Sequence, residues 1–201
     1  MRSLPNGRPS ARAASSTKLP RMALTATVYN LEIALSDVDR SVYETLELRV
    51  AQHPSETMPR MLVRTLAYCL AYEEGIAFSK GGLSSTEEAP ISVRDGTGRL
   101  LHWIDIGAPS PERLHKASKL ARVSIYTHEL AQLRRQSEGK TIHKASTIEV
   151  SAFDPSFIDA LAEKVARRTK LEVTRTDGNL YVVVDGTTFE TTPGRTMLEP
   201  G

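Results

Sequence analysis

Apolar and polar residues alternate near the start of the chain in a way that predicts a β-hairpin. Between Thr25 and Leu35, β-branched and aromatic residues recur as they do in strands. Leu46, Leu48 and Val50 then alternate with charged residues, after a polar turn at residues 36–40. This pattern predicts an N-terminal hairpin with one face in water.

The spacing of apolar residues changes from two to three and four after His53-Pro54, which predicts a helix over residues 56–74. Ser55 precedes this helix and is a favourable N-cap. Arg60 and Arg64 lie one turn apart on a second helix face, where we expect both to be solvated. The apolar stripe of the helix consists of Met58, Met61, Leu62, Thr65, Leu66, Cys69 and Leu70.

A second hairpin is predicted where Asp95-Gly96 separates the strand-like residues 91–94 and 100–106. Ser110-Pro111 then opens a helix to about residue 121, and residues 123–127 form a short β-rich run. A helix between two such strands predicts a βαβ crossover with a parallel pair. We expect Trp103 to share one core with the stripe of the first helix.

The rest of the chain continues the alternation of helices and strands. Residues 128–138 and the stretch after Asp154 predict helices, and residues 146–151 predict a strand. A last hairpin is predicted across Asp177-Gly178, with a short edge strand from Thr187 before residues 193–201 fray. The order predicts an α/β fold with a mixed sheet, flanking helices and a parallel pair near its middle.

Composition narrows the class of protein. The 201 residues suffice for one domain, here residues 22–192, and the net charge of +2 gives no basic signature of nucleic-acid binding. The lone Cys69 excludes a disulfide framework and a cysteine-based zinc site. No apolar run approaches the length of a membrane helix. We expect a cytoplasmic monomer that does not enter the membrane.

The first 21 residues differ from the rest because they contain arginine, serine and proline but no acid. Three interpretations fit them: a transit peptide, a disordered basic tail, or translation that begins at Met22. We favour the last, because the strand pattern starts directly after Met22.

The most informative stretch is residues 103–107, where Asp105 lies between Ile104 and Ile106. A buried carboxylate is costly unless a partner or a metal meets it. Strand alternation places Trp103, Asp105 and Gly107 on one face, and Gly107 allows another group to approach the backbone closely. Asp105 could belong to an acidic metal site at the end of this strand. It could also cap the next turn or pair with an arginine.

Four segments carry a resemblance to a known family. They are Met22-Ala-Leu-Thr-Ala-Thr, residues 53–64 (HPSETMPRMLVR), Phe78-Ser-Lys-Gly-Gly-Leu and Trp103-Ile-Asp-Ile-Gly-Ala-Pro. In this order and spacing, from Met22 to about Val184, they resemble the YaeQ family of small bacterial proteins. The resemblance implies a variation on the PD-(D/E)XK nuclease core, in which two carboxylates and a lysine surround Mg²⁺ or Mn²⁺.

Carried onto this chain, the resemblance implies Glu88 and Asp105 as metal ligands. Gly107 stands where the lysine is normal, so Lys116 on the next helix is the substitute catalytic ammonium. Asp95 is the alternative first acid, but it is better explained as the hairpin turn residue. Glu56, Arg64 and Lys80 are further candidates. His102 and His115 could assist a metal, although no zinc-type histidine spacing is present.

Two functions remain open from the sequence. One is a Mg²⁺-dependent phosphodiesterase acting on nucleic acid, with cations such as Lys80 and Arg113 meeting the phosphates. The other is a binding or regulatory protein on a catalytically degenerate nuclease fold. The absent in-strand lysine and the small net charge favour the second function. A nuclease-like fold does not by itself establish nuclease activity.

Overall fold

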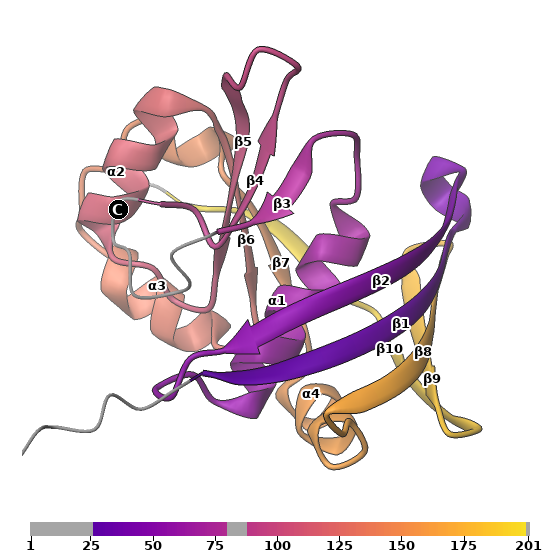
Figure 1. Ribbon diagram of the computed structural model, residues 1–201. Helices are drawn as coiled ribbons and strands as arrows, with labels where there is room; N and C mark the ends of the chain where they lie inside the picture. The colour runs from indigo at the N-terminus through magenta and orange to yellow at the C-terminus, as the bar shows by residue number, and fades with distance from the viewer. Residues whose placement is uncertain (1–25, 80–87, 200–201) are drawn as a thin grey trace, which may run out of the picture.

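The computed structural model describes residues 26–79 and 88–199, in which two mixed β-sheets enclose and flank four α-helices (Figure 1). The helices are α1 (Met58–Leu70), α2 (Pro111–Leu120), α3 (Leu130–Ser137) and α4 (Pro155–Ala162). Two short 3-10 helices, η1 (Val38–Arg40) and η3 (Ala145–Thr147), complete the helical elements of this part of the chain. The predicted mixed α/β class is thus confirmed.

Each sheet combines parallel and antiparallel strands. Sheet A has the order β10-β9-β8-β1-β2 and sheet B the order β11-β7-β6-β5-β4-β3. The strands of sheet A are β1 (Thr27–Asp37), β2 (Val42–Gln52), β8 (Arg168–Thr176), β9 (Asn179–Val184) and β10 (Thr187–Thr191). Those of sheet B are β3 (Ile76–Phe78), β4 (Ile91–Arg94), β5 (Leu100–Ile106), β6 (Arg122–Thr127), β7 (Glu149–Ala152) and β11 (Gly194–Met197).

The N-terminal hairpin forms as predicted but is longer than the sequence pattern indicated. β1 and β2 pair antiparallel along their whole length, from Thr27 opposite Gln52 to Asp37 opposite Val42. Alternate side chains of β1 are buried, so one face of the hairpin lies on the core and the other is open. β1 also pairs in parallel with β8, so sheet A contains strands from both the first and the last third of the chain.

Helix α1 lies behind sheet A and packs against sheet B on its other side (Figure 1). Its N-cap is Thr57, whose hydroxyl accepts a hydrogen bond from the Arg60 amide at 3.4 Å. The predicted cap, Ser55, was wrong. Its hydroxyl lies 2.7 Å from His53 Nδ1, within the turn that precedes the helix. The apolar stripe of α1 is buried as predicted, except for Met58, which is half-buried against the same core.

The crossover from β5 through α2 to β6 is confirmed, with β5 and β6 parallel and Trp103 opposite Val123. Ser110 caps α2 by accepting a hydrogen bond from the Arg113 amide at 3.3 Å. β4 precedes β5 in an antiparallel hairpin across Asp95-Gly96, also as predicted. This arrangement places Asp105 next to helix α2.

Sheet B separates two hydrophobic cores. The stripe of α1 packs with Ile104 and Ile106 in the core between the two sheets, together with α4. Trp103 lies on the opposite face of β5, in a second core with Leu114 of α2 and Leu133 of α3. The prediction of one shared core for Trp103 and the α1 stripe was therefore wrong, because successive residues of β5 point to opposite faces and both faces are covered.

The C-terminal segment also departs from the prediction. Residues 193–201 were expected to fray, yet Gly194–Met197 form β11, which pairs antiparallel with β7 at the edge of sheet B. The first 21 residues lie outside the described residues. Within residues 26–79 and 88–199, no helix is both long and apolar enough to cross a membrane.

Replacing Leu66 with alanine is expected to lower the free energy of unfolding by about 2–5 kcal/mol. Leu66 is only 2% exposed and belongs to the core between the sheets, so the substitution leaves a cavity. Urea denaturation followed by circular dichroism measures the effect. Leu120→Ala is the matched control, because Leu120 is 64% exposed. Equal losses in the two variants would contradict the assignment of this helix face to the core.

Candidate functional site

The Asp105 carboxylate is buried and fully engaged by neighbouring side chains. Only 2% of the residue is exposed. Arg113 Nε donates to Oδ1 at 3.0 Å and to Oδ2 at 2.8 Å, and Trp103 Nε1 donates to Oδ2 at 2.8 Å. The charge of the aspartate is thus balanced by a guanidinium, which was one of the alternatives that the sequence left open.

Arg113 connects this carboxylate with the loop before β4. It lies in the first turn of α2, and its guanidinium carbon is 5.1 Å from the centre of the Trp103 ring. Its Nη2 donates to the Glu88 backbone carbonyl at 2.7 Å. Stacking on an aromatic ring while binding oxygen acceptors is typical of arginine rather than lysine. Arg113 therefore holds β5, α2 and the Glu88 peptide together.

Arg113 links the Glu88 backbone to Asp105, but the Glu88 carboxylate binds a different residue. Glu88 Oε2 accepts a hydrogen bond from the Ser79 hydroxyl at 2.7 Å, and the residue is exposed. The alternative acid, Asp95, accepts hydrogen bonds from Thr97 and Arg99 in the hairpin turn. These bonds, that of the Thr97 hydroxyl first, hold the pKa of Asp95 below its usual value. Asp95 is thus the turn residue that the sequence indicated.

Lys116 follows Arg113 by three residues on α2. The residue of α2 that binds the Asp105 carboxylate is Arg113. A guanidinium therefore takes the place next to Asp105 that we expected for the Lys116 ammonium. A catalytic role for Lys116 stays a prediction, and Lys80 lies outside the described residues. Within residues 26–79 and 88–199, no three His, Cys, Asp or Glu side chains are grouped so that they could hold a metal ion.

Glu56 and Arg64 form a second buried ion pair, at the start of α1. Arg64 Nε and Nη2 donate to the two Glu56 carboxylate oxygens at 3.0 and 2.8 Å, and Nη2 also donates to the Ala51 carbonyl at 2.9 Å. The guanidinium stacks on Phe78, 5.3 Å from the ring centre. Arg64 is 5% exposed, so the expectation that it is solvated was wrong. This pair ties β2 and β3 to α1.

Gly107 admits a close approach, as its position predicted. Its φ of +78° is a conformation that favours glycine. A Cβ built there would lie 2.6 Å from Arg60 Nη1 and 3.2 Å from Glu129 Oε2. The Arg60 guanidinium therefore covers the Gly107 backbone, and a side chain at this position would displace it.

His102 is buried on the other face of β5, away from Asp105. Its Nε2 lies 2.9 Å from the Ser124 hydroxyl, and Arg122 Nη2 lies 2.8 Å from Nδ1. Burial, and then the positive charge of Arg122, lower the pKa of His102 to about 4. The ring is therefore neutral near pH 7, and its nitrogens are engaged by Ser124 and Arg122 rather than directed to the predicted metal site.

Protonation of His102 is expected to destabilise the fold in acid. The unfolded chain takes up this proton below pH 6.5, whereas the folded protein resists it until about pH 4. Stability from this residue is therefore complete above pH 6.5 and falls as the pH drops to 4, by about 3 kcal/mol in total. Denaturation across this range should show a steeper loss for wild type than for His102→Gln. Parallel pH profiles would contradict the assignment.

Comparison with known proteins identifies relatives of this chain. A family model described as "YaeQ protein" matches residues 22–193. A Salmonella typhi protein described as "Uncharacterized protein YaeQ" is 30% identical over 164 residues, covering 80% of this chain and 90% of that protein. The Escherichia coli (strain K12) protein of the same description is 28% identical over 172 residues, covering 84% and 94% of the two chains.

Two solved structures have the same fold. The crystal structure of YaeQ protein from Xanthomonas axonopodis pv. citri aligns with a TM-score of 0.76 at 30% identity, covering 87% of this chain and 100% of that chain. That of YaeQ protein from Pseudomonas syringae aligns with a TM-score of 0.72 at 30% identity, covering 88% and 97%. The similarity thus extends over both sheets.

Proposed function

Since the chain belongs to the YaeQ family, and its relatives from Salmonella typhi and Escherichia coli are described as uncharacterised, we propose a function from its own geometry. We propose a binding or regulatory protein on a nuclease-like fold. In this protein the acid of the former motif, Asp105, serves as one half of a structural ion pair. Cleavage of nucleic acid is then not its activity.

The nuclease-like part of this proposal rests on the arrangement around β5. Glu88 lies in the loop three residues before the first residue of β4, and β4 pairs with β5 so that Ile91 lies opposite Ile104. One acid therefore lies in the loop that leads into β4 and the other in the neighbouring strand β5, and α2 and β6 follow as a parallel crossover. This supports a variation on the PD-(D/E)XK core, which the resemblance implied.

The observation that carries the proposal is the bond between Asp105 and Arg113. A cation would compete with a guanidinium that already contacts both carboxylate oxygens, and with the indole N–H of Trp103. Charge-assisted bonds of this kind are among the stronger hydrogen bonds in proteins. Glu88, the second acid, directs its carboxylate to Ser79. In this arrangement the described residues do not fit a divalent cation without rearrangement.

The alternative is a Mg²⁺-dependent phosphodiesterase that uses Glu88, Asp105 and Lys116. One observation favours it: Arg113 contacts both Asp105 and the Glu88 backbone, so the two acidic residues lie within the reach of one side chain. A rotation of Arg113 would free Asp105 Oδ1 and leave Trp103 Nε1 as the donor to Oδ2. This alternative predicts metal binding, which the ion-pair proposal does not.

Calorimetric titration with Mg²⁺ and Mn²⁺, together with plasmid and RNA cleavage assays, separates the two functions. We expect no saturable binding at millimolar concentration and no metal-dependent cleavage by the wild type. Asp95→Asn is the matched control for Asp105→Asn, because Asp95 is a half-buried acid in the hairpin turn and is not part of the Asp105 network. Metal binding that Asp105→Asn weakens at least tenfold, about 1.4 kcal/mol, while Asp95→Asn retains it, would overturn the proposal in favour of the phosphodiesterase.

A further inference from the structure

The open face of sheet A carries a row of polar side chains that the Asp105 network does not involve. Arg49 of β2, Asn30 of β1 and Arg168 of β8 occupy matching positions, since Asn30 pairs in register with both arginines. All three residues are exposed. They border a hollow of about 640 Å³ on this face. The row therefore runs across three neighbouring strands.

Neither arginine of this row is neutralised. Within residues 26–79 and 88–199, no hydrogen-bond or ion-pair partner contacts either guanidinium or the side-chain amide of Asn30. The nearest acids along these strands are Glu47, two residues from Arg49, and Glu32, two residues from Asn30. Glu32, however, pairs with Lys170 at 2.9 Å. The structure thus keeps the positive row apart from the acids of the next row.

Further cationic residues lie close to Arg168 in the sequence and add positive charge to this end of sheet A. Residues 164–170, which lead into β8, contain four cationic residues and no acid, although one of the four, Lys170, is paired with Glu32. The whole chain has a net charge of only +2, so this cluster is a local feature rather than a consequence of a basic protein. Clustered cations raise the local concentration of anions and speed their association.

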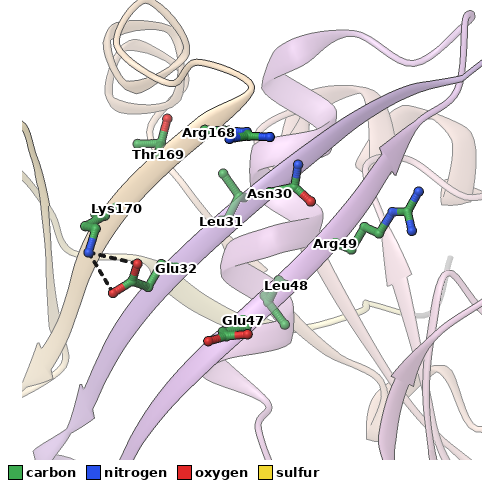
Figure 2. Close-up of a pocket in the computed structure, with 9 residues that line it drawn as sticks. All are labelled: Asn30, Leu31, Glu32, Glu47, Leu48, Arg49, Arg168, Thr169 and Lys170. Atoms are coloured by element: carbon green, nitrogen blue, oxygen red, sulfur yellow. Dashed lines mark hydrogen bonds and ion pairs between the residues drawn. The ribbon is translucent and has the colours of Figure 1, made fainter.

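Figure 2 shows how the side chains of the row lie. The Arg168 guanidinium extends toward β1 beside Asn30, whereas the Arg49 guanidinium turns away from β1. Neighbouring strands are about 4.8 Å apart, so the two arginines start roughly 10 Å from each other at the backbone. An exposed arginine changes rotamer within nanoseconds. Both guanidiniums can therefore close on one group placed over Asn30.

From this geometry we infer that the open face of sheet A binds a phosphate group, held between Arg49 and Arg168 with the Asn30 amide as a central donor. Guanidinium forks match the oxygens of phosphate and bind them in pairs. A phosphate ester and a nucleic-acid strand share this chemistry. The inference goes beyond the proposed function, because Asp105 lies on sheet B and takes no part in it.

The test measures binding of a fluorescent, 5′-phosphorylated single-stranded oligonucleotide by anisotropy, with wild type and the double variant Arg49→Gln/Arg168→Gln. We expect the variant to bind at least tenfold more weakly. Its dependence of log K on log salt should also be shallower by about 0.7, the value for one lost phosphate contact on a single strand. Arg134→Gln/Arg135→Gln on α3 removes the same charge from exposed positions and should change the affinity less than twofold.

Competition by inorganic phosphate and by a mononucleotide identifies the source of the phosphate. If the mononucleotide displaces the labelled oligonucleotide at a concentration similar to that at which the oligonucleotide itself binds, the ligand is a small phosphate ester. If the oligonucleotide stays bound, the ligand is a strand. Either result supports the site. As a second readout, phosphate titration should shift the NMR resonances of the Asn30 side-chain amide. The inference is overturned if none of these probes binds, or if the two double variants lose affinity equally.

Discussion

Replacing Arg113 with methionine should lower the free energy of unfolding by about 3–5 kcal/mol, the range for breaking a buried ion pair from one side. The substitution leaves the Asp105 carboxylate, whose side chain is 3% exposed, with Trp103 Nε1 as its remaining donor from the present network. Methionine retains most of the apolar length of the side chain, so lost charge rather than lost packing dominates. Urea denaturation measures the difference.

Arg99→Met is the control for this substitution. Arg99 is exposed in the β4–β5 turn, and its amide rather than its guanidinium provides the bond to Asp95. A loss of less than 1 kcal/mol is expected there, as for most surface substitutions. If Arg113→Met were as mild as Arg99→Met, the Asp105 carboxylate would have to be satisfied by a group other than Arg113.

Replacing Arg64 with methionine should have an effect of the same size, also about 3–5 kcal/mol. The Glu56 side chain has no exposed surface, so its charge would remain buried without the guanidinium. The Ala51 carbonyl would also lose its side-chain donor. Chemical denaturation of this variant should show a midpoint far below that of Arg135→Met, which removes an exposed arginine from α3.

A double variant shows whether charge is the cause. Adding Glu56→Gln to Arg64→Met removes the unpaired charge, and part of the lost stability should return. If the double variant is as unstable as the sum of the two single variants, the pair is not coupled, and Arg64 acts through packing on Phe78 instead.

Local sequence patterns were sufficient for most of the elements. The alternation of apolar residues predicted the first hairpin, and the three- and four-residue spacing predicted α1. Asp95-Gly96 and Ser110-Pro111 marked the turn and the helix start around β5. These features depend on neighbours within a few residues, so they can be read from the chain directly.

Long-range pairing could not be predicted in the same way. β1 and β8 pair in parallel although Glu32 and Lys170 lie 138 residues apart, and this pairing creates a second sheet. The separation of Trp103 from the α1 stripe follows from the same division, because sheet B has a core on each face. β11 was missed since its pairing with β7 depends on an edge that exists only in the folded protein.

At the site, alternation along β5 correctly placed Asp105 beside Trp103, and the glycine at 107 correctly indicated a close approach. The partner of Asp105 was harder to predict. Arg113 and Lys116 are three residues apart on the same helix, so the choice depends on helix phase and side-chain reach. Arg113 also stacks on Trp103, a contact that no local pattern reveals.

The central claim is that Asp105 and Arg113 form a structural ion pair, and a double-mutant cycle tests it most directly. The unfolding free energies of wild type, Asp105→Asn, Arg113→Met and the double variant are measured with and without 10 mM Mg²⁺. We predict a coupling energy of about 2 kcal/mol or more, within the range for contacting residues, that magnesium does not change. A coupling below about 0.5 kcal/mol, or stabilisation of the wild type by magnesium that Asp105→Asn abolishes, would contradict the claim.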